Sequence, residues 1–195
     1  MLSRLIHIFL LSLLLVQSAH AAMITESGGI MTGATGIEVN GILYDVSFKD
    51  GTCVSLFDGC DQTSDFPFDV STSSLAMGAL KTIIESTIYT NRPRGFTGCT
   101  SLVVTAECYL LNPHSFSRSD EVNGTFLQIT LFTAPRLVES SVIITDDTTT
   151  NVIATYTLWT RQTSTTIPEP SSLLLIGMGL LGQRLLRSRS KRLQV

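Results

Sequence analysis

Alternation of apolar and polar residues marks the segment that follows residue 36. Three apolar side chains and three polar ones interleave, namely Tyr44, Val46 and Phe48 with Asp45, Ser47 and Lys49. This pattern predicts a strand with one buried face. Asn40-Gly41, between that strand and residues 37–39, predicts a tight hairpin because both residues tolerate positive φ. Asp50-Gly51 predicts the next turn and residues 53–57 a third strand, so we expect an antiparallel meander here.

The period of the pattern changes between residues 73 and 88. The pattern there repeats at spacings of three and four, at Ala76, Leu80, Ile83, Ile84 and Thr87. That spacing predicts one amphipathic helix, with a Ser or Thr between residues 71 and 74 as its N-cap. Arg92-Pro93-Arg94-Gly95 is expected to end it.

Strand patterns return after the helix. They cover residues 102–106, 125–132, 140–145 and 152–160, and the polar run 146–151 predicts a hairpin loop between the last two. Trp159 ends the last strand. The alternation there is equally consistent with a tryptophan that packs in the core and with one displayed on the surface. The predicted fold class is α+β, an antiparallel β-sheet with one packed amphipathic helix.

The N-terminus has the pattern of a secretory signal peptide. Arg4 precedes an apolar run over residues 5–16, and Ala19-His20-Ala21 supplies small residues for cleavage after Ala21. The alternative is a membrane anchor that is never removed. The run is shorter than the roughly 20 residues that span a bilayer, which favours removal.

The C-terminus combines a short motif, an apolar run and a basic tail. Pro168, Glu169 and Pro170 precede an apolar run that begins at Ser171, and the tail is formed by Arg184, Arg187, Arg189, Lys191 and Arg192. Residues 171–186 would reach roughly 24 Å as a helix, against a hydrocarbon core near 30 Å. The basic tail favours a transmembrane helix over a buried core helix, by the positive-inside rule.

These C-terminal residues resemble the PEP-CTERM sorting signal of exported proteins in Gram-negative bacteria. The resemblance covers roughly residues 167–192 and departs from the commonest form where Gln183 interrupts the apolar run. It implies recognition by exosortase, a membrane-embedded cysteine transpeptidase or protease, with cleavage near Pro-Glu-Pro. It also implies a bacterium that makes exopolysaccharide and biofilm matrix. Residues 34–60 resemble, more weakly, uncharacterised ectodomains that carry this signal.

The chain is thus expected to have four parts. They are a signal peptide (residues 1–21), an exported α+β domain (22–162), a polar linker (163–167) and the sorting signal (168–195). Signal peptidase and exosortase are the expected partners during export, together with the membrane that the C-terminal helix spans before processing. The expected location is an inner-membrane-anchored intermediate, followed by the cell surface or extracellular matrix.

Four cysteines, Cys53, Cys60, Cys99 and Cys108, lie in the exported domain. An even count in an oxidising compartment favours disulfides over metal ligands or a nucleophile. Three pairings are possible, and the local spacing favours Cys53–Cys60 and Cys99–Cys108. A zinc site is the alternative, but the chain has no Cys-x-x-Cys pair and few histidines.

The charge of the exported domain differs from that of the whole chain. Residues 22–167 carry seven basic and fifteen acidic side chains, a net charge near −8, whereas the whole chain has −3. Binding to nucleic acid or to an anionic polysaccharide requires clusters of Lys and Arg. We therefore expect neither as a partner.

Residues suited to catalysis are scarce. After export the remaining histidine is His114, in Asn112-Pro113-His114-Ser115, which is interpreted as a solvent-exposed turn. No Gly-x-Ser-x-Gly, His-Glu-x-x-His or phosphate-binding loop is present. Asp58, Asp61, Asp65 and Asp69 form an acidic stretch that is interpreted as a surface loop, with calcium binding as the alternative. No catalytic, cofactor-binding or metal-binding residue is assigned, and no cofactor is expected.

Two hypotheses of function follow. The first is a non-enzymatic cell-surface or matrix protein whose domain binds or packs among exopolysaccharide. The second is an exported glycan hydrolase, which needs two carboxylates facing a cleft. A cleft with paired carboxylates would favour the hydrolase, and aromatic residues on a flat sheet would favour glycan binding.

Overall fold

The structure is a computed structural model that describes residues 21–99, 107–150 and 153–163. Contacts divide the chain into two units, Met1–Gln162 and Thr163–Val195. Every helix and strand that the structure describes lies in the first unit.

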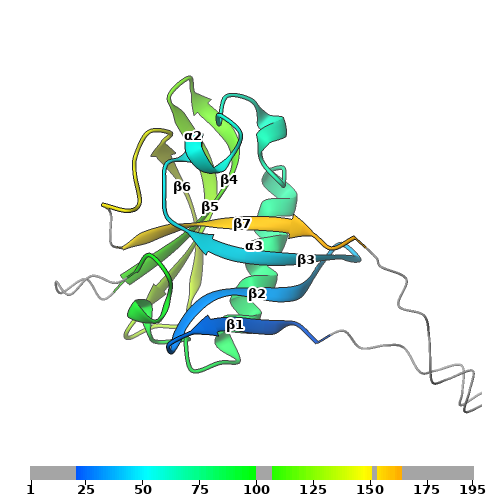
Figure 1. The fold of residues 1–195 in the computed structure, drawn as a ribbon, viewed down its shortest axis with the longest axis vertical. Coiled ribbons are helices and arrows are strands. Elements are labelled where there is room, and N and C mark those ends of the chain that lie inside the picture. Colours follow the sequence, from blue (N-terminus) through cyan, green and yellow to red (C-terminus); the bar gives the residue numbers. More distant parts are fainter. Residues whose placement is uncertain (1–20, 100–106, 151–152, 164–195) are drawn as a thin grey trace, which may run out of the picture. The chain divides into compact units, whose positions relative to one another are not determined.

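The described part of the chain forms one mixed, seven-stranded sheet, in the order β1-β2-β3-β7-β4-β5-β6. Its strands are β1 (Met23–Ser27), β2 (Ile30–Val39), β3 (Ile42–Lys49), β4 (Glu107–Arg118), β5 (Glu121–Thr130), β6 (Arg136–Ile143) and β7 (Ala154–Arg161). In Figure 1, β1, β2, β3 and β7 run across the view whereas β4 and β5 run up it. The sheet therefore twists strongly between β7 and β4.

The α+β fold class is confirmed, but the expectation of a purely antiparallel sheet is wrong. β7 inserts between β3 and β4, antiparallel to β3 and parallel to β4. For the same reason the predicted hairpin between residues 140–145 and 152–160 is wrong. β6 and β7 are not neighbours, because β7 crosses back to the middle of the sheet.

The predicted hairpin at Asn40-Gly41 is confirmed. β2 and β3 pair antiparallel up to Val39 and Ile42, and Asn40 and Gly41 have φ angles of 51° and 75°. Both angles lie in the left-handed region that Asn and Gly tolerate best. The third strand of the opening meander is β1, before this hairpin and not after it.

The predicted helix is present as α3 (Val70–Glu85), but it starts earlier than expected. Its N-cap is Asp69, not a Ser or Thr between residues 71 and 74. The Asp69 carboxylate accepts a hydrogen bond from the Thr72 backbone N–H at 2.8 Å, which satisfies one of the free donors of the first turn. The helix ends at Glu85, before the Arg92-Pro93 segment that was expected to end it.

One face of the sheet packs against α3 to form the larger core (Figure 1). The helix contributes Ala76, Met77, Leu80 and Ile84, and the strands contribute Met31, Ile37, Phe48, Leu110, Leu127 and Ile129. Ala76, Leu80 and Ile84 lie four positions apart, as the sequence pattern predicted, and Met77 lies three positions before Leu80.

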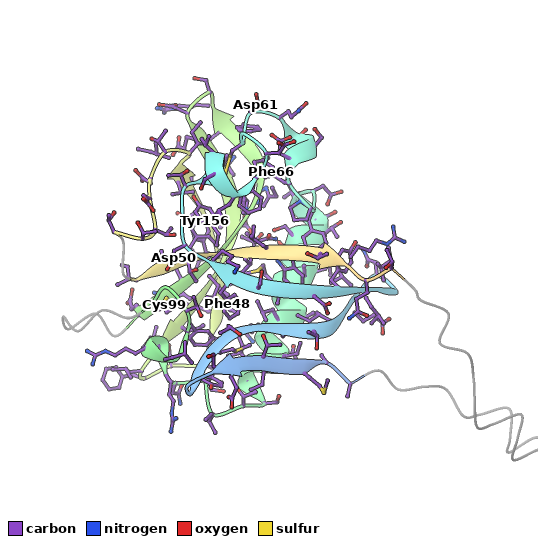
Figure 2. The ribbon with its side chains drawn as sticks, in the orientation of Figure 1. Phe48, Asp50, Asp61, Phe66, Cys99 and Tyr156 are labelled. Atoms are coloured by element: carbon purple, nitrogen blue, oxygen red, sulfur yellow. A yellow bond between two sulfur atoms is a disulfide. The ribbon has the colours of Figure 1, made fainter. Side chains whose placement is uncertain are left out.

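The opposite face of the sheet carries a second core, covered by the segment from residue 50 to residue 68. This segment contains α2 (Cys53–Leu56) and the short 3-10 helix η1 (Thr63–Asp65). Tyr156 and Phe66, labelled in Figure 2, belong to this core, whereas Phe48 belongs to the core under α3.

The strand predicted at residues 53–57 is wrong, because α2 occupies that position. Thr52 and Ser55 form a capping box that starts a helical turn. Each side chain accepts from the other residue's backbone N–H, both at 3.1 Å. The predicted strand at residues 102–106 lies outside the described residues.

Both disulfides favoured by the sequence are present. Cys53 is bonded to Cys60 and Cys99 to Cys108, and all four residues are buried. The first bond ties the start of α2 to the loop that leaves it. The second ties the segment after the 3-10 helix η2 (Pro93–Gly95) to β4.

Candidate functional site

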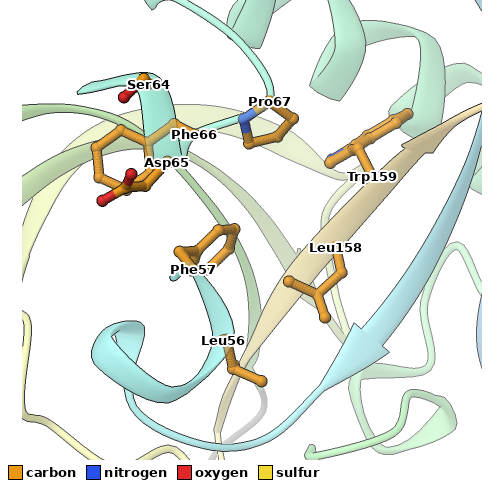
Figure 3. Close-up of a pocket in the computed structure, with 8 residues that line it drawn as sticks. All are labelled: Leu56, Phe57, Ser64, Asp65, Phe66, Pro67, Leu158 and Trp159. Carbon is orange, nitrogen blue, oxygen red and sulfur yellow. The ribbon is translucent and has the colours of Figure 1, made fainter. Parts of the chain in front are cut away.

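A groove lies between the segment covering the second core and the C-terminal half of β7 (Figure 3). It has a volume of about 320 Å³. Eight residues line it, namely Leu56, Phe57, Ser64, Asp65, Phe66, Pro67, Leu158 and Trp159. Six of these are apolar or aromatic, and the two polar ones come from η1.

The floor of the groove is held in place by aromatic contacts and by a disulfide. The Phe57 ring packs edge-on against Phe66 and Tyr156, with centroids 6.0 and 5.7 Å apart. Phe57 directly follows α2, whose first residue is bonded to Cys60. The Cys53–Cys60 bond therefore limits how far Phe57 can move away from β7.

Trp159 forms one wall of the groove. Its side chain packs in the core and is not displayed on the surface, the two alternatives that the sequence pattern allowed. Only 8% of the residue is exposed, and its ring packs edge-on against Phe68 and Tyr44. Its indole N–H donates to Thr157 Oγ1 at 3.1 Å. The polar atom of the tryptophan thus serves the core and not a ligand.

Asp65 is the one titratable residue in the lining of the groove. Its Oδ2 accepts from the backbone N–H groups of Asp61 and Gln62, at 3.0 and 3.1 Å. One oxygen of the carboxylate therefore holds the turn before η1. Within the described residues Oδ1 has no hydrogen-bond partner.

The acidic stretch from residue 58 to residue 69 does not converge on one point. Asp58 has a φ of 44° in the turn after α2, Asp61 is exposed, and Asp69 caps α3. The hydrogen bonds from Thr72 and Ser71 hold the pKa of Asp69 below its usual value. Among the described residues no three His, Cys, Asp or Glu side chains lie close enough together to hold a metal ion.

His114 lies in a strand and not in an exposed turn, so that prediction is wrong. Asn112-Pro113-His114 falls inside β4, and only 6% of His114 is exposed. A bulge in the pairing of β4 with β5, between Pro113 and Ser115, accommodates the proline. The Asn-Pro dipeptide, which usually marks a turn, here marks this bulge.

The imidazole of His114 lies between a hydroxyl and a carboxylate. Its Nδ1 lies 3.0 Å from Ser115 Oγ, and its Nε2 lies 3.1 Å from Glu139 Oε2. Glu139 belongs to β6, and its side chain is 57% exposed. Because an ionised carboxylate only accepts, it holds the proton of a neutral imidazole on Nε2 and leaves Nδ1 to accept from Ser115.

Further hydrogen bonds connect Glu139 to the helix and to the buried part of the sheet. Its Oε1 accepts from Thr125 Oγ1 at 2.8 Å and from Ser74 Oγ at 3.3 Å. Thr125 in turn accepts from Ser73 Oγ at 3.0 Å. We call Ser73, Thr125, His114, Ser115 and Glu139 the polar row. The row crosses β4, β5 and β6 and reaches α3.

The order hydroxyl, imidazole and carboxylate is the order that serine hydrolases use. None of the three residues lines the groove. His114 is almost fully buried and bonded on both ring nitrogens, and Glu139 also bonds to Thr125 and Ser74. The contacts therefore fit a role in holding three strands and a helix together.

Sequence reasoning missed Glu139 and the position of His114. Neither residue sits in a recognisable motif, and they lie 25 positions apart. Thr125 of β5 pairs with Asn112 of β4 and with Glu139 of β6, and this register brings Glu139 close to His114. A single sequence does not reveal such strand pairing.

The processing residues predicted from sequence fall mostly outside the described part of the chain. Pro168, Glu169, Pro170 and Ala19 lie outside it, and Ala21 is its first, exposed residue. Within residues 21–99, 107–150 and 153–163, no helix is long and apolar enough to cross a membrane.

Comparison with known proteins identifies the C-terminal segment. Residues 166–191 match the family model described as the PEP-CTERM protein-sorting motif. No curated protein matches the chain, and no solved structure matches it either. The match agrees with the resemblance seen at Pro168-Glu169-Pro170 and the basic tail. The chain carries a PEP-CTERM sorting motif and is an exported protein of the kind that exosortase sorts.

Proposed function

We propose that the exported domain is a binding module of the cell surface or extracellular matrix, and that its groove binds a neutral segment of exopolysaccharide without turnover. The groove is the observation that carries this proposal. Six of its eight lining residues are apolar or aromatic, and Asp65 and Ser64 add one carboxylate and one hydroxyl. Ligand sites commonly combine a mostly apolar lining with a few polar groups that fix orientation.

The chemistry of the lining suits a sugar ring. The C–H face of a sugar is apolar and packs on surfaces such as Leu158 and Pro67, while its hydroxyls need hydrogen-bond partners. Asp65 Oδ1 accepts from such a hydroxyl, and Ser64 Oγ both donates and accepts. Ser64 and Pro67 are exposed, so a ligand reaches the groove from solvent.

The same lining argues against the hydrolase. Glycoside hydrolysis uses two carboxyl groups about 5–10 Å apart on either side of the bond that breaks. Asp65 is the single carboxylate among the lining residues, and its Oδ2 is held by two backbone N–H groups. A groove of this composition can hold a sugar, but its lining lacks the pair of carboxyl groups that would act as acid and base in hydrolysis.

The charge of the domain narrows the ligand class. Residues 22–167 have a net charge near −8, so a polysaccharide that carries uronate or sulfate groups is repelled. A neutral glycan avoids this cost. After exosortase acts, such binding would hold the released domain in the matrix.

The test measures binding of the exported protein to neutral exopolysaccharide fragments from its own host. Ser64→Arg places a long side chain at the rim and is expected to weaken binding at least tenfold. Ser27→Arg makes the same change at an exposed position of β1, away from the groove, and should bind like the wild type. Equal binding by both variants would reject the groove, and release of shortened glycan would reject binding without turnover.

A further inference from the structure

β6 is the last strand of the sheet in the described part of the chain. β5 pairs with one side of β6 over eight residues, from Arg136 to Ile143. No described segment pairs with the other side. Among the described residues, the outer backbone N–H and C=O groups of this edge have no partner strand, and such groups can pair with another strand.

The opposite edge of the sheet, β1, is better protected than β6. β1 has five residues, and its pairing with β2 shifts register between Thr25 and Glu26. β6 has eight residues in unbroken register with β5 and contains neither Pro nor Lys. Proteins commonly protect sheet edges with short strands, bulges, Pro and charged side chains, Lys above all. β6 is neither short nor bulged and has no Pro or Lys; its charged residues are Arg136 and Glu139.

The side chains along β6 are apolar at positions where solvent reaches them. Leu137 and Ile143 are 38% and 48% exposed, on the face of the sheet that α3 covers only in part. Just before the strand, Leu131 and Phe132 are 47% and 85% exposed. Exposed apolar side chains that gather in one region of a surface often mark an interaction site.

The charge of β6 is balanced, although the domain is acidic. The strand has one positive residue, Arg136, and one negative residue, Glu139, and Glu139 is bonded to His114 and Thr125. The net charge near −8 repels a second copy of the domain, but the charges of β6 itself sum to zero and add nothing to that repulsion.

We propose that β6 pairs antiparallel with β6 of a second copy, in the register that places the two Ser140 residues opposite each other. A two-fold axis through such a pair is perpendicular to the sheet, so each residue meets a residue of the same face. In this register Leu137 meets Ile143 of the second copy, and Val138 meets Val142. Cross-strand pairs of apolar residues stabilise a sheet.

Neighbouring registers are less complementary. Shifting the centre to Glu139 places two carboxylates directly opposite each other, which is unfavourable. Shifting it to Ser141 places Ile143 opposite Glu139 and Val142 opposite Ser140. The register centred on Ser140 avoids both faults, because Glu139 then meets Ser141.

Cross-linking of the protein as its host exports it tests the pairing. In Ser140→Cys the two thiols face each other, and a short thiol cross-linker should give a covalent dimer on a non-reducing gel. Ser141→Cys lies one residue further along β6, and Ser119→Cys lies in the turn between β4 and β5. Both should cross-link at least tenfold more slowly. Equal rates at Ser140 and Ser119 would overturn the pairing, and a faster rate at Ser141 would overturn the register.

A second variant tests the edge without a new cysteine in it. Ile143→Lys places a charge directly opposite Leu137 of the second copy, where the pairing would remove it from water. Light scattering should therefore show that the dimer is lost. Ile88→Lys changes a residue that is 63% exposed and lies between α3 and η2, so the dimer should persist. A monomeric wild type, or a dimer unchanged by Ile143→Lys, would contradict the proposal. Either result would mean that another segment covers β6 or that the edge stays open.

Discussion

His114 Nε2 lies 3.1 Å from Glu139 Oε2, and the two residues belong to β4 and β6, which β5 separates. Thr125 of β5 lies in register with Glu139 and donates to it. The contact therefore joins three strands through side chains in addition to their backbone ladders. It also reaches α3, since Ser74 donates to the same carboxylate.

Glu139→Gln should destabilise the domain. The substitution keeps the shape of the side chain but removes the charge that two hydroxyls and an imidazole contact. We expect a loss of about 1–2 kcal/mol in the free energy of unfolding, measured in urea, because hydrogen bonds to charged groups are the stronger ones. Glu38→Gln, at an exposed position of β2, should change it by less than about 0.5 kcal/mol. Equal losses would show that the polar row contributes no stability.

Two buried tyrosines should respond differently to the loss of their hydroxyl groups. The Tyr156 hydroxyl has no hydrogen-bond partner among the described residues, and burial, with Asp146 adding repulsion, raises its pKa to about 12. The Tyr89 hydroxyl donates to Glu26 at 2.8 Å.

Tyr156→Phe is expected to leave the free energy of unfolding unchanged or to raise it, since no hydrogen bond is lost. Tyr89→Phe is expected to lower it by about 1 kcal/mol. Thermal unfolding of the two variants side by side decides the matter. A large loss from Tyr156→Phe would mean that its hydroxyl has a partner, such as a buried water.

Asp69 should make the stability of the domain depend on acidic pH. Its pKa is lowered in the folded state by the Thr72 backbone N–H and hydroxyl, and by the Ser71 hydroxyl. The carboxylate therefore contributes stability above its usual pKa of 3.8, and this contribution is lost as the pH falls through the lower, folded-state pKa. Asp69→Asn keeps a capping oxygen without a charge.

Urea unfolding at several pH values measures this effect. The wild type should exceed Asp69→Asn in stability at pH 6, and the difference should shrink as the pH falls below about 4. A difference that stays constant over this range would show that the charge of the cap is unimportant.

Ser115 should not act as a nucleophile, although it lies beside His114. We expect a fluorophosphonate probe to leave Ser115 of the exported protein unlabelled in mass spectrometry, because His114 is almost fully buried and neither His114 nor Ser115 lines the groove. Labelling that disappears in Ser115→Ala and falls in Glu139→Gln would identify a serine hydrolase in place of a binding module.

The parts of the fold that were predictable depend on local chemistry. Asn40-Gly41 sets its hairpin through its own backbone preferences, and the apolar period of α3 follows from helix geometry. The two short-range disulfides also follow from spacing within the sequence.

The parts that failed depend on distant residues. β7 joins the centre of the sheet through pairing with β3 and β4, and no local signal distinguishes that from a hairpin with β6. Asn112-Pro113 was interpreted as a turn from its local sequence. The bulge that instead accommodates it in β4 forms only when β4 pairs with β5, which the sequence does not show. Trp159 and η1 line the same groove only because β7 has inserted into the sheet, so the lining was not predictable either.

Sorting by exosortase is the claim on which the function rests, and intact mass spectrometry of the protein from its host tests it most directly. We expect the mature protein to lack residues 184–195, since cleavage near Pro168-Glu169-Pro170 removes everything after it. In a strain without exosortase, the protein should keep this tail and remain with the membrane. An unchanged mass and location in that strain would contradict the account.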